Sequence, residues 1–397
     1  MYRPKYQDIL NTAGTPAYVF DIDVLKQRIR QIKETFGERV HICYAMKANP
    51  FVVGEIKDEI DRYEVCSPGE FQICERAQVP MNKVVLSGVY KESKDIERIL
   101  PVYQDHIVYT CESVHQFHLI NQTAIKHHLV VKVLLRVTTG NQFGIDEPEL
   151  CELVRDRTQY TGVTMIGIQH FSGTQRKRLS KYEEELAYAD ELITKLKQEY
   201  DYEAQELEFG PGFYVEYFQD GKPYEEAELM EGFKELLENL NFKGTITLEL
   251  GRFIAASCGT YYTQIVDMKK NHDITWCIVN GGMHQLSYFG QMMAMKLPFH
   301  RHLKENTTTD DIIKCNISGS LCTVNDNIVK NMPLRNPEIG DILEFQHTGA
   351  YCMCEGISLF LSRDLPKVYL YDEKEGLKLM RDTFETNVLN YKSIGGK

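Results

Sequence analysis

The feature that most constrains the fold is an alternation of short apolar segments with helix-like segments over roughly 230 residues. Eight segments have the composition of buried strands: His41 to Met46, Tyr63 to Cys66, Val84 to Ser87, His106 to Tyr109, Val131 to Val137, Met165 to His170, Glu206 to Phe209 and Gly244 to Glu249. Helical patterns separate several of them, at Phe51 to Ile60, Gly69 to Arg76, Ser93 to Leu100 and Ser113 to Ile120. Because strands that alternate with helices form parallel sheets, the pattern predicts a closed (β/α)8 barrel of the TIM type.

The pattern changes after about Arg252. Strand-like segments then follow one another without intervening helices, at Thr260 to Lys269, Ile274 to Asn280, Ile312 to Ser318, Asp341 to Phe345 and Val368 to Tyr371. A further strand is expected at 15–20, before a helix over 23–36. We therefore expect an α/β protein with two domains: the barrel at 22–258, and a mainly β domain built from 1–21 and 259–397.

Charge and composition exclude several classes of protein. The formal net charge of −12 argues against a nucleic-acid partner, since such proteins usually carry a basic patch. No apolar run is long enough for a transmembrane helix, and Met1 to Tyr6 lack the apolar core of a secretory signal. Eleven cysteines without such a signal indicate free thiols in a reducing cytoplasm. Cys352 and Cys354 form a CxC, which is weak evidence for a metal, and no metal site is expected.

Lys47 stands where the second predicted strand meets an Ala-Asn-Pro turn. Barrels build their sites at this end of their strands. A lysine that is poorly hydrated there can act as a nucleophilic amine, and such an amine is the natural carrier of a carbonyl cofactor. Taken alone, the position also fits a strand-end lysine that simply reaches solvent.

Three other predicted strand ends carry polar or glycine-rich sequences. They are Gln169 to Gln175, Phe209 to Phe213 and Glu249 to Arg252. Each has a structural alternative, respectively a strand-to-loop turn, a plain tight turn and a surface ion pair. Together with Lys47 they predict a pyridoxal 5′-phosphate site, with an amine for the aldehyde, a carboxylate for the pyridine nitrogen and glycine amides for the phosphate.

These motifs resemble those of the fold-type III pyridoxal-phosphate decarboxylases, which include the diaminopimelate and ornithine decarboxylases. The resemblance runs from Pro16 to about Tyr371 and implies a barrel domain of the alanine-racemase type. It rests on nine ordered motifs: Tyr44 to Asn49, Cys66 to Glu70, Leu86 to Val89, Gln142 to Ile145, Gly173 to Gln175, Gly210 to Phe213, Glu249 to Arg252, Gly319 to Cys322 and Gly349 to Tyr351.

The resemblance implies roles for individual residues. Lys47 would form the Schiff base, and Glu249 would keep the pyridine nitrogen protonated. Cys322 would come from the partner subunit of a head-to-tail homodimer and return a proton to Cα after carbon dioxide leaves. The phosphate would be held by Thr174, Gly212, Arg252 and Tyr351, and Gly210 and Gly251 would also bind the cofactor.

The chain departs from the family pattern at the ring that stacks on the cofactor. The family carries a histidine two residues before the Gly-Ser of its motif, and in this register the chain has Phe171, with His170 one residue earlier. Because side chains alternate across a strand, we expect Phe171 to stack, and a local bulge would put His170 there instead.

A second departure bears on the substrate. Family members that act on basic amino acids commonly carry an acid directly after the cysteine, and this chain has Thr323 there, with Asp326 three residues later. Thr323 and Asp326 are the candidate substrate residues. Losing the adjacent acid removes a charge-assisted contact to a distal amino group. The hypothesis is therefore decarboxylation of a modified or carrier-protein-bound amino acid, as in antibiotic and siderophore pathways.

Three alternatives remain open. They are a diaminopimelate decarboxylase of lysine biosynthesis, an amino-acid racemase on the same barrel, and an inactive regulatory homologue. The Cys322 loop favours a decarboxylase over a racemase, and the presence of Lys47, Glu249 and Arg252 argues against an inactive homologue. The segment from Met283 to Glu305, with its methionines, is expected either to shape the substrate site or to fill the core, and the core is slightly favoured.

Overall fold

The computed structural model describes residues 11, 13–219, 221, 224–304 and 311–391. Two compact units make up the chain. The β unit contains Met1–Leu25, Val215–Pro223 and Ala255–Lys397, and the barrel unit contains Lys26–Tyr214 and Tyr224–Ile254. These ranges differ from the expected domains mainly at 215–223, which groups with the β unit. The Met1 to Tyr6 segment, on which the expectation of no secretory signal rests, lies outside the described residues.

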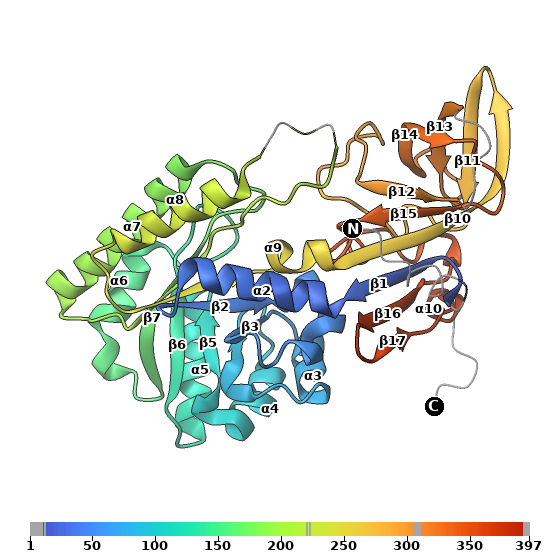
Figure 1. Cartoon of the computed structure of the whole chain (residues 1–397). Helices are drawn as coiled ribbons and strands as arrows, with labels where there is room; N and C mark the ends of the chain where they lie inside the picture. Colours follow the sequence, from blue (N-terminus) through green and yellow to red (C-terminus); the bar gives the residue numbers. More distant parts are fainter. Residues whose placement is uncertain (1–10, 12, 220, 222–223, 305–310, 392–397) are drawn as a thin grey trace. The chain divides into compact units, whose positions relative to one another are not determined.

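The barrel unit is the closed eight-stranded barrel that the sequence predicts (Figure 1). Its strands are β2 (Val40–Ala45), β3 (Arg62–Val65), β4 (Val84–Leu86), β5 (Val108–Cys111), β6 (Val131–Arg136), β7 (Val163–Phe171), β8 (Glu206–Gly210) and β9 (Thr245–Leu250). All neighbours pair in parallel, and β9 closes the ring against β2. The carboxyl ends of all eight strands therefore meet at one end of the barrel.

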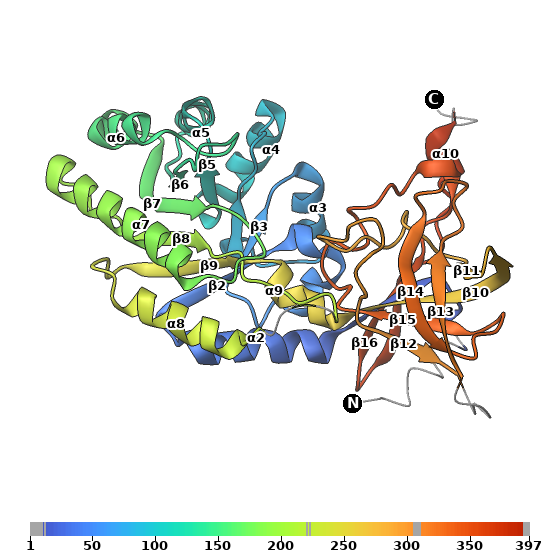
Figure 2. The ribbon, with the colours of Figure 1, turned by 90° about the horizontal axis from the view of Figure 1, so that it is seen from above.

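Helices surround this barrel on the outside (Figure 2). They are α3 (Pro68–Arg76), α4 (Ser93–Tyr103), α5 (Val114–Lys126), α6 (Glu147–Arg155), α7 (Leu179–Tyr200) and α8 (Glu226–Glu238), while α2 (Ile22–Phe36) begins in the β unit. The helix expected over 51–60 is wrong in type, since a 3₁₀-helix spans Pro50–Glu55 instead. Two β-branched valines followed by Gly54 give this segment a low α-helix propensity.

The barrel interior contains both apolar and charged side chains. Val85, Val108, Leu134 and Ile166 form one apolar cluster in the interior. Other inward side chains are charged and paired. Arg136 donates to Glu112 at 2.9 Å, Arg62 pairs with Glu206, and Thr247 Oγ1 donates to Glu206 Oε1 at 2.7 Å. Because a buried charge is costly unless it is paired, these pairs make a polar interior possible.

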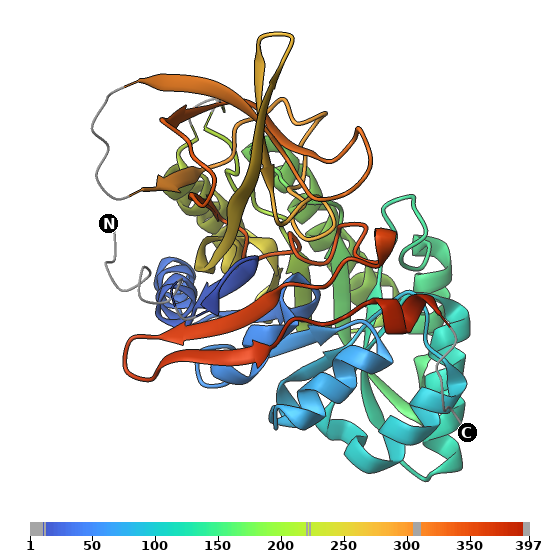
Figure 3. The ribbon, with the colours of Figure 1, turned by 90° about the vertical axis from the view of Figure 1, so that its right-hand side faces the viewer.

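The β unit is built around a mixed sheet in the order β14-β13-β11-β10-β1-β16-β17, with β15 pairing both β10 and β12. The strands that the sequence predicts are β1 (Ala17–Asp21), β10 (Gly259–Asn271), β11 (Ile274–Val279), β13 (Ile312–Ser318), β15 (Ile342–Gln346) and β16 (Lys367–Asp372). The pattern does not reveal β12 (His300–Leu303), β14 (Asn327–Arg335) and β17 (Gly376–Arg381). The ends of β10 and β11 form a long antiparallel hairpin, which is the yellow one in Figure 3.

The methionine-rich segment does not fill a core. Met292, Met293 and Met295 are 68–79% exposed, so the slightly favoured core reading is wrong for this part of the segment. Its last residue, Glu305, lies outside the described residues. Within the described ranges, no helix combines the length and the apolar character needed to cross a bilayer.

We predict that Asp190 is a main anchor of the barrel's outer layer. Its buried carboxylate on α7 accepts hydrogen bonds from Asn241 N, Asn241 Nδ2 and Phe242 N at 2.8–2.9 Å, and so ties the helix to the turn before β9. Asp190→Ala leaves these donors unsatisfied and should lower the free energy of unfolding by about 2–4 kcal/mol. The measurement is urea unfolding followed by circular dichroism.

The matched control for this variant is the neighbouring exposed residue, Glu191→Ala. Its effect on the free energy of unfolding should stay within about 0.5 kcal/mol. Equal effects of the two variants would contradict an anchoring role for Asp190.

Candidate active site

Lys47 lies in a one-turn 3₁₀-helix, Met46–Ala48, that directly follows β2. Met46 and Ala48 are buried, which leaves Lys47 as the half-exposed residue of the turn. The turn is held by Asn49, whose side chain accepts from Phe51 N and whose carbonyl accepts from Tyr44 Oη, both at 3.1 Å. The local sequence therefore directs one amine to the carboxyl end of the barrel.

Two buried carboxylates form ion pairs with this amine. Lys47 Nζ lies 2.6 Å from Glu64 Oε2 and 3.4 Å from Glu249 Oε1. Burial, and then the nearby Glu64 carboxylate, raise the pKa of Glu249 to about 7, and the Lys47 ammonium partly opposes this shift. Gln169 Nε2 donates to the other oxygen of Glu249 at 3.1 Å. The arrangement holds a positive amine and a readily protonated acid side by side.

Phe171, and not His170, lies on the same side as the glycine at the end of β8. A Cβ built on Gly210 would come within 2.1 Å of Cδ2 of Phe171, so that ring packs directly on the glycine. His170 instead is buried, with its ring stacked on Phe209 at 5.5 Å and 6.1 Å from that of Tyr188 on α7. The structure therefore does not bring His170 into the cluster around Lys47, because neighbouring residues on β7 face opposite ways.

The loops after β7 and β8 lie against each other through two glycines. Gly212 has φ +59°, and a Cβ there would come 1.9 Å from the carbonyl oxygen of Gly173. Arg176 N donates to Gly212 O at 3.0 Å, and Tyr214 N donates to Arg176 O at 3.1 Å. Thr174 is exposed beside this contact. Glycine at both positions leaves the backbone amides accessible, which is the condition for a backbone contact to an anion.

The motif after β9 lies at the same end of the barrel. Gly251 separates Glu249 from Arg252, and Arg252 is a buried residue that begins the short helix α9 (Arg252–Ala255). The motif thus places an acid and a guanidinium close together in sequence at the strand's carboxyl end.

The remaining predicted residues belong to the β unit. Cys322 is exposed and Thr323 is half-buried. Tyr351 has φ +65° and opens a turn in which Cys354 N and Glu355 N donate to its carbonyl.

Asp326 has a structural role in the described conformation. It is buried, and its two carboxylate oxygens accept hydrogen bonds from Met283 N and Leu321 N, both at 2.7 Å. These bonds fix the base of the loop that carries Cys322, and the role of Asp326 toward a substrate stays a prediction.

The sequence reasoning did not assign three residues that stand close to the predicted ones. Glu64 contacts Lys47, Cys66 Sγ lies 3.8 Å from Lys47 Nζ, and the guanidinium carbon of Arg136 lies 5.9 Å from the centre of the Phe171 ring. Glu64 and Arg136 face inward near the ends of β3 and β6, where a charged residue in an apolar strand is the signal that indicates them.

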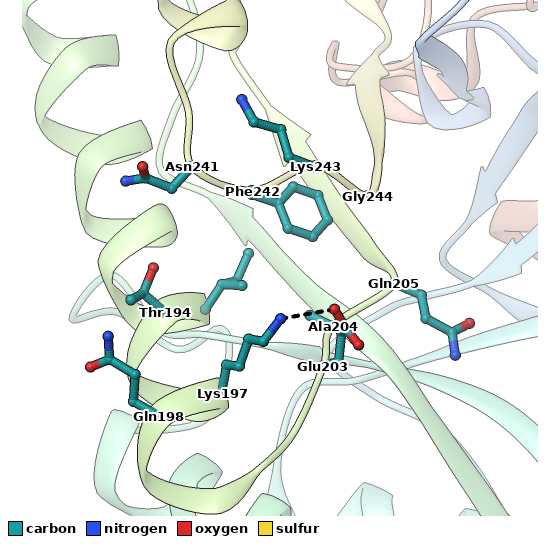
Figure 4. A pocket seen from close by; sticks show the side chains of 11 residues that line it. Thr194, Lys197, Gln198, Glu203, Ala204, Gln205, Asn241, Phe242, Lys243 and Gly244 are labelled. Carbon is teal, nitrogen blue, oxygen red and sulfur yellow. Dashed lines mark hydrogen bonds and ion pairs between the residues drawn. The ribbon is translucent and has the colours of Figure 1, made fainter.

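A cavity of about 770 Å³ lies at the other end of the strands, away from Lys47 (Figure 4). Its lining includes Gln205 and Gly244, which precede β8 and β9, together with Lys197 and Glu203, which are 3.0 Å apart. Gly244 precedes Glu249 by five residues, or about 17 Å along an extended strand. This cavity is therefore separate from the Lys47 cluster.

The donor set around Lys47 fits pyridoxal 5′-phosphate. The amine suits the aldehyde, Glu249 suits the pyridine nitrogen, Phe171 offers an apolar ring, and the Gly173 and Gly212 backbones suit the phosphate.

Comparisons with known proteins agree with this fit. A family model described as "Pyridoxal-dependent decarboxylase, pyridoxal binding domain" matches residues 22–256. The diaminopimelate decarboxylase of Aquifex aeolicus is 25% identical over 362 residues, covering 87% of this chain and 84% of the relative. The L-glutamyl-(BtrI acyl-carrier protein) decarboxylase of Niallia circulans is 24% identical over 379 residues, covering 89% and 87%. Other relatives of similar identity are mostly diaminopimelate decarboxylases.

The fold is also that of solved structures. The crystal structure of diaminopimelate decarboxylase from Helicobacter pylori complexed with L-lysine has a TM-score of 0.83 at 23% identity. The match covers 97% of this chain and 98% of the other. The barrel and the mainly β unit therefore both have a counterpart in a known fold.

We predict that Lys47→Ala abolishes the visible absorbance band of protein-bound pyridoxal 5′-phosphate, because the variant has no amine at the carboxyl end of β2. The measurement is the absorption spectrum after incubation with the cofactor and removal of the excess. The control is Lys132→Ala, which removes an exposed lysine from the opposite end of β6 and should leave the band intact. A band that survives in Lys47→Ala would contradict the assignment.

The raised pKa of Glu249 predicts a pH dependence of stability in the cofactor-free protein. Between a pH of about 4.5 and about 7, Glu249 stays protonated in the folded protein but is ionised in the unfolded chain. The tighter binding of this proton stabilises the fold. This contribution is complete below about pH 4.5 and is lost as the pH rises through about 7. Glu249→Gln should therefore lose less stability than the wild type between about pH 5 and about pH 8. Thermal unfolding midpoints across this range test it, and parallel pH curves would contradict it.

Proposed function

Since the chain belongs to the pyridoxal-dependent decarboxylases and acts on amino acids with pyridoxal 5′-phosphate as cofactor, we propose roles for its residues and a class of substrate. The bound cofactor supplies a ring that accepts the electron pair released with carbon dioxide. Lys47 provides the amine that bonds to the cofactor. Glu249, oriented by Gln169, holds a proton on the pyridine nitrogen. The contact of 3.4 Å between Lys47 and Glu249 carries this proposal.

The cofactor's ring and phosphate are proposed to lie between the loops after β7, β8 and β9. Phe171 contacts the ring face, as its packing on Gly210 supports. The phosphate would be bound by two kinds of residue. Glycines would offer backbone amides, and the other residues would offer polar or charged side chains: Thr174, Gly210, Gly212, Gly251, Arg252 and Tyr351.

Cys322 is proposed to return the proton to Cα from the partner subunit of a homodimer. The thiol is exposed in this chain, and its loop is fixed at the base by Asp326. A thiol is a suitable proton donor near neutral pH. All eleven cysteines are free thiols, which supports a reducing location such as the cytoplasm.

The geometry of the Cys322 loop favours a substrate without a second ammonium group. Thr323 carries no charge, and the Asp326 carboxylate is already occupied by two backbone N–H groups. The loop therefore offers no carboxylate to a distal amino group, which a modified or carrier-bound amino acid does not require. The Niallia circulans relative, named for a carrier-protein substrate, supports this proposal.

Diaminopimelate is the second candidate, and the relatives support it more broadly. Most relatives of comparable identity carry that name, while the identities of 25% and 24% to the two kinds of enzyme are nearly equal. The number of similar relatives thus favours diaminopimelate as the substrate. The lack of a free carboxylate in the Cys322 loop favours a conjugated amino acid.

Carbon dioxide release separates the two candidates. The holoenzyme is assayed with diaminopimelate, lysine, ornithine, and glutamate joined to an acyl-carrier protein. We expect turnover of the conjugate and little of the three free diamino acids, because the loop has no free acid for a distal ammonium. Efficient release from diaminopimelate would overturn the conjugate proposal. Racemisation without carbon dioxide would instead indicate a racemase.

We predict that Cys322→Ala lowers kcat by about 10²-fold, because the variant loses the proposed proton donor to Cα. Cys354→Ala removes the other exposed thiol of the β unit and should stay within about twofold of the wild type. Steady-state carbon dioxide release measures both. Equal rates in the two variants would remove Cys322 from the proposal.

A further inference from the structure

Glu208 is a buried acid that none of the proposed roles uses. It lies on β8 between Glu206 and Gly210, on the inward face of the barrel strand, and it is fully buried. Neither of its carboxylate oxygens has a hydrogen-bond partner among the described residues. An ionised carboxylate without a single donor, away from water, is among the costliest groups to bury.

The charges around Glu208 are mostly of its own sign. Burial raises its pKa most, then the carboxylates of Glu249, Glu206 and Glu64, while Arg62 alone opposes them. Arg62 is already paired with Glu206. Among the groups that face Glu208, the Cys43 thiol on β2 adds no positive charge, and its own pKa is raised, first by burial and then by Glu208. These surroundings favour the neutral acid.

A second unpartnered atom lies on the adjacent strand. Gln169 on β7 pairs in register with Glu208, and its side-chain oxygen Oε1 is also buried without a partner in the described part of the chain. The same amide donates through Nε2 to Glu249. Two buried polar groups on neighbouring strands that do not bond directly form a site for a buried water molecule.

We propose that Glu208 is a protonated carboxylic acid, that a buried water joins it to Gln169 Oε1, and that it thereby positions Gln169 against Glu249. The neutral acid donates to the water, and the water donates to Gln169 Oε1, which leaves Nε2 to donate to the Glu249 carboxylate. An ionised Glu208 would instead add an anion beside Glu249. The positioning role rests on the proposed role of Glu249, whereas the protonation of Glu208 does not.

The first experiment tests protonation without the cofactor. Infrared difference spectra compare the wild type with Glu208→Gln at neutral pH. We expect the carbonyl band of a protonated acid to disappear in the variant. Glu206→Gln is the matched control two residues away on the same strand, and it should remove a carboxylate band and no acid band, because Glu206 is paired with Arg62 and Thr247. If that control does not fold, Glu59→Gln, at the exposed pair with Arg30, replaces it.

Two results of this experiment would overturn protonation. One is a difference spectrum between the wild type and Glu208→Gln that contains no acid band, because the band of a protonated Glu249 is common to both proteins and cancels. The other is failure of Glu208→Gln to fold at neutral pH, because a neutral amide of the same size should replace a neutral acid.

The second experiment tests positioning in the holoenzyme. The pH midpoint at which the bound cofactor's absorbance changes is measured for Glu208→Leu and Glu208→Gln. We expect Glu208→Leu, which removes the polar bridge, to shift this midpoint, and Glu208→Gln to restore it. An unchanged midpoint in Glu208→Leu, or equal shifts in both variants, would overturn the positioning role. Failure of both variants and the wild type to bind cofactor would count against the proposed function and leave the infrared result standing.

Discussion

The contact between the Lys47 amine and two buried carboxylates is the interaction on which the site depends. A single ammonium at the end of β2 lies within 3.4 Å of both Glu64 and Glu249. Two acids close together cannot both stay ionised at low cost without such a cation. A reaction that removed the positive charge of this amine would favour protonation of both carboxylates, because each would lose its nearby cation. In the cofactor-free barrel the same contact therefore offsets the repulsion between the two acids.

This interaction lies in a barrel whose interior carries several buried charges, and the chain pairs them. Arg136 pairs with Glu112 at the carboxyl ends of β6 and β5, and Arg62 pairs with Glu206 at the amino ends of β3 and β8, while an apolar cluster fills another part of the interior. Buried pairs contribute little net stability, so their value lies in the site they make possible. The glycines after β7 and β8 have a similar role. Gly212 brings two backbones together where any side chain would collide with the Gly173 carbonyl.

The eight barrel strands were predictable because each is a short apolar run, and burial on both faces imposes that composition directly. The helices α6, α7 and α8 were not predicted, since α7 carries many charges around a narrow apolar stripe. The strands β12 and β17 were missed because they are only half-buried or exposed and carry no apolar run. In the candidate site, Lys47 and Glu249 were predicted from their places at strand ends, and the structure brings them within 3.4 Å of each other. Glu64 was missed because nothing in the sequence shows which inward acid meets a lysine from another strand.

Asp326 illustrates how a predicted site residue can also have a structural role. Its spacing from Cys322 suggests a ligand for the substrate, yet both oxygens are bound to backbone N–H groups of two different segments. A carboxylate used in this way fixes loop geometry, because moving it would strand two buried donors. In the described conformation this acid therefore stabilises the loop that carries Cys322. Uncharged Thr323 is the polar side chain next to the thiol, and its hydroxyl can hydrogen-bond an amide or thioester oxygen. The proposed substrate class rests on this loop, because the fold is shared with the diaminopimelate decarboxylases and does not distinguish the two candidates.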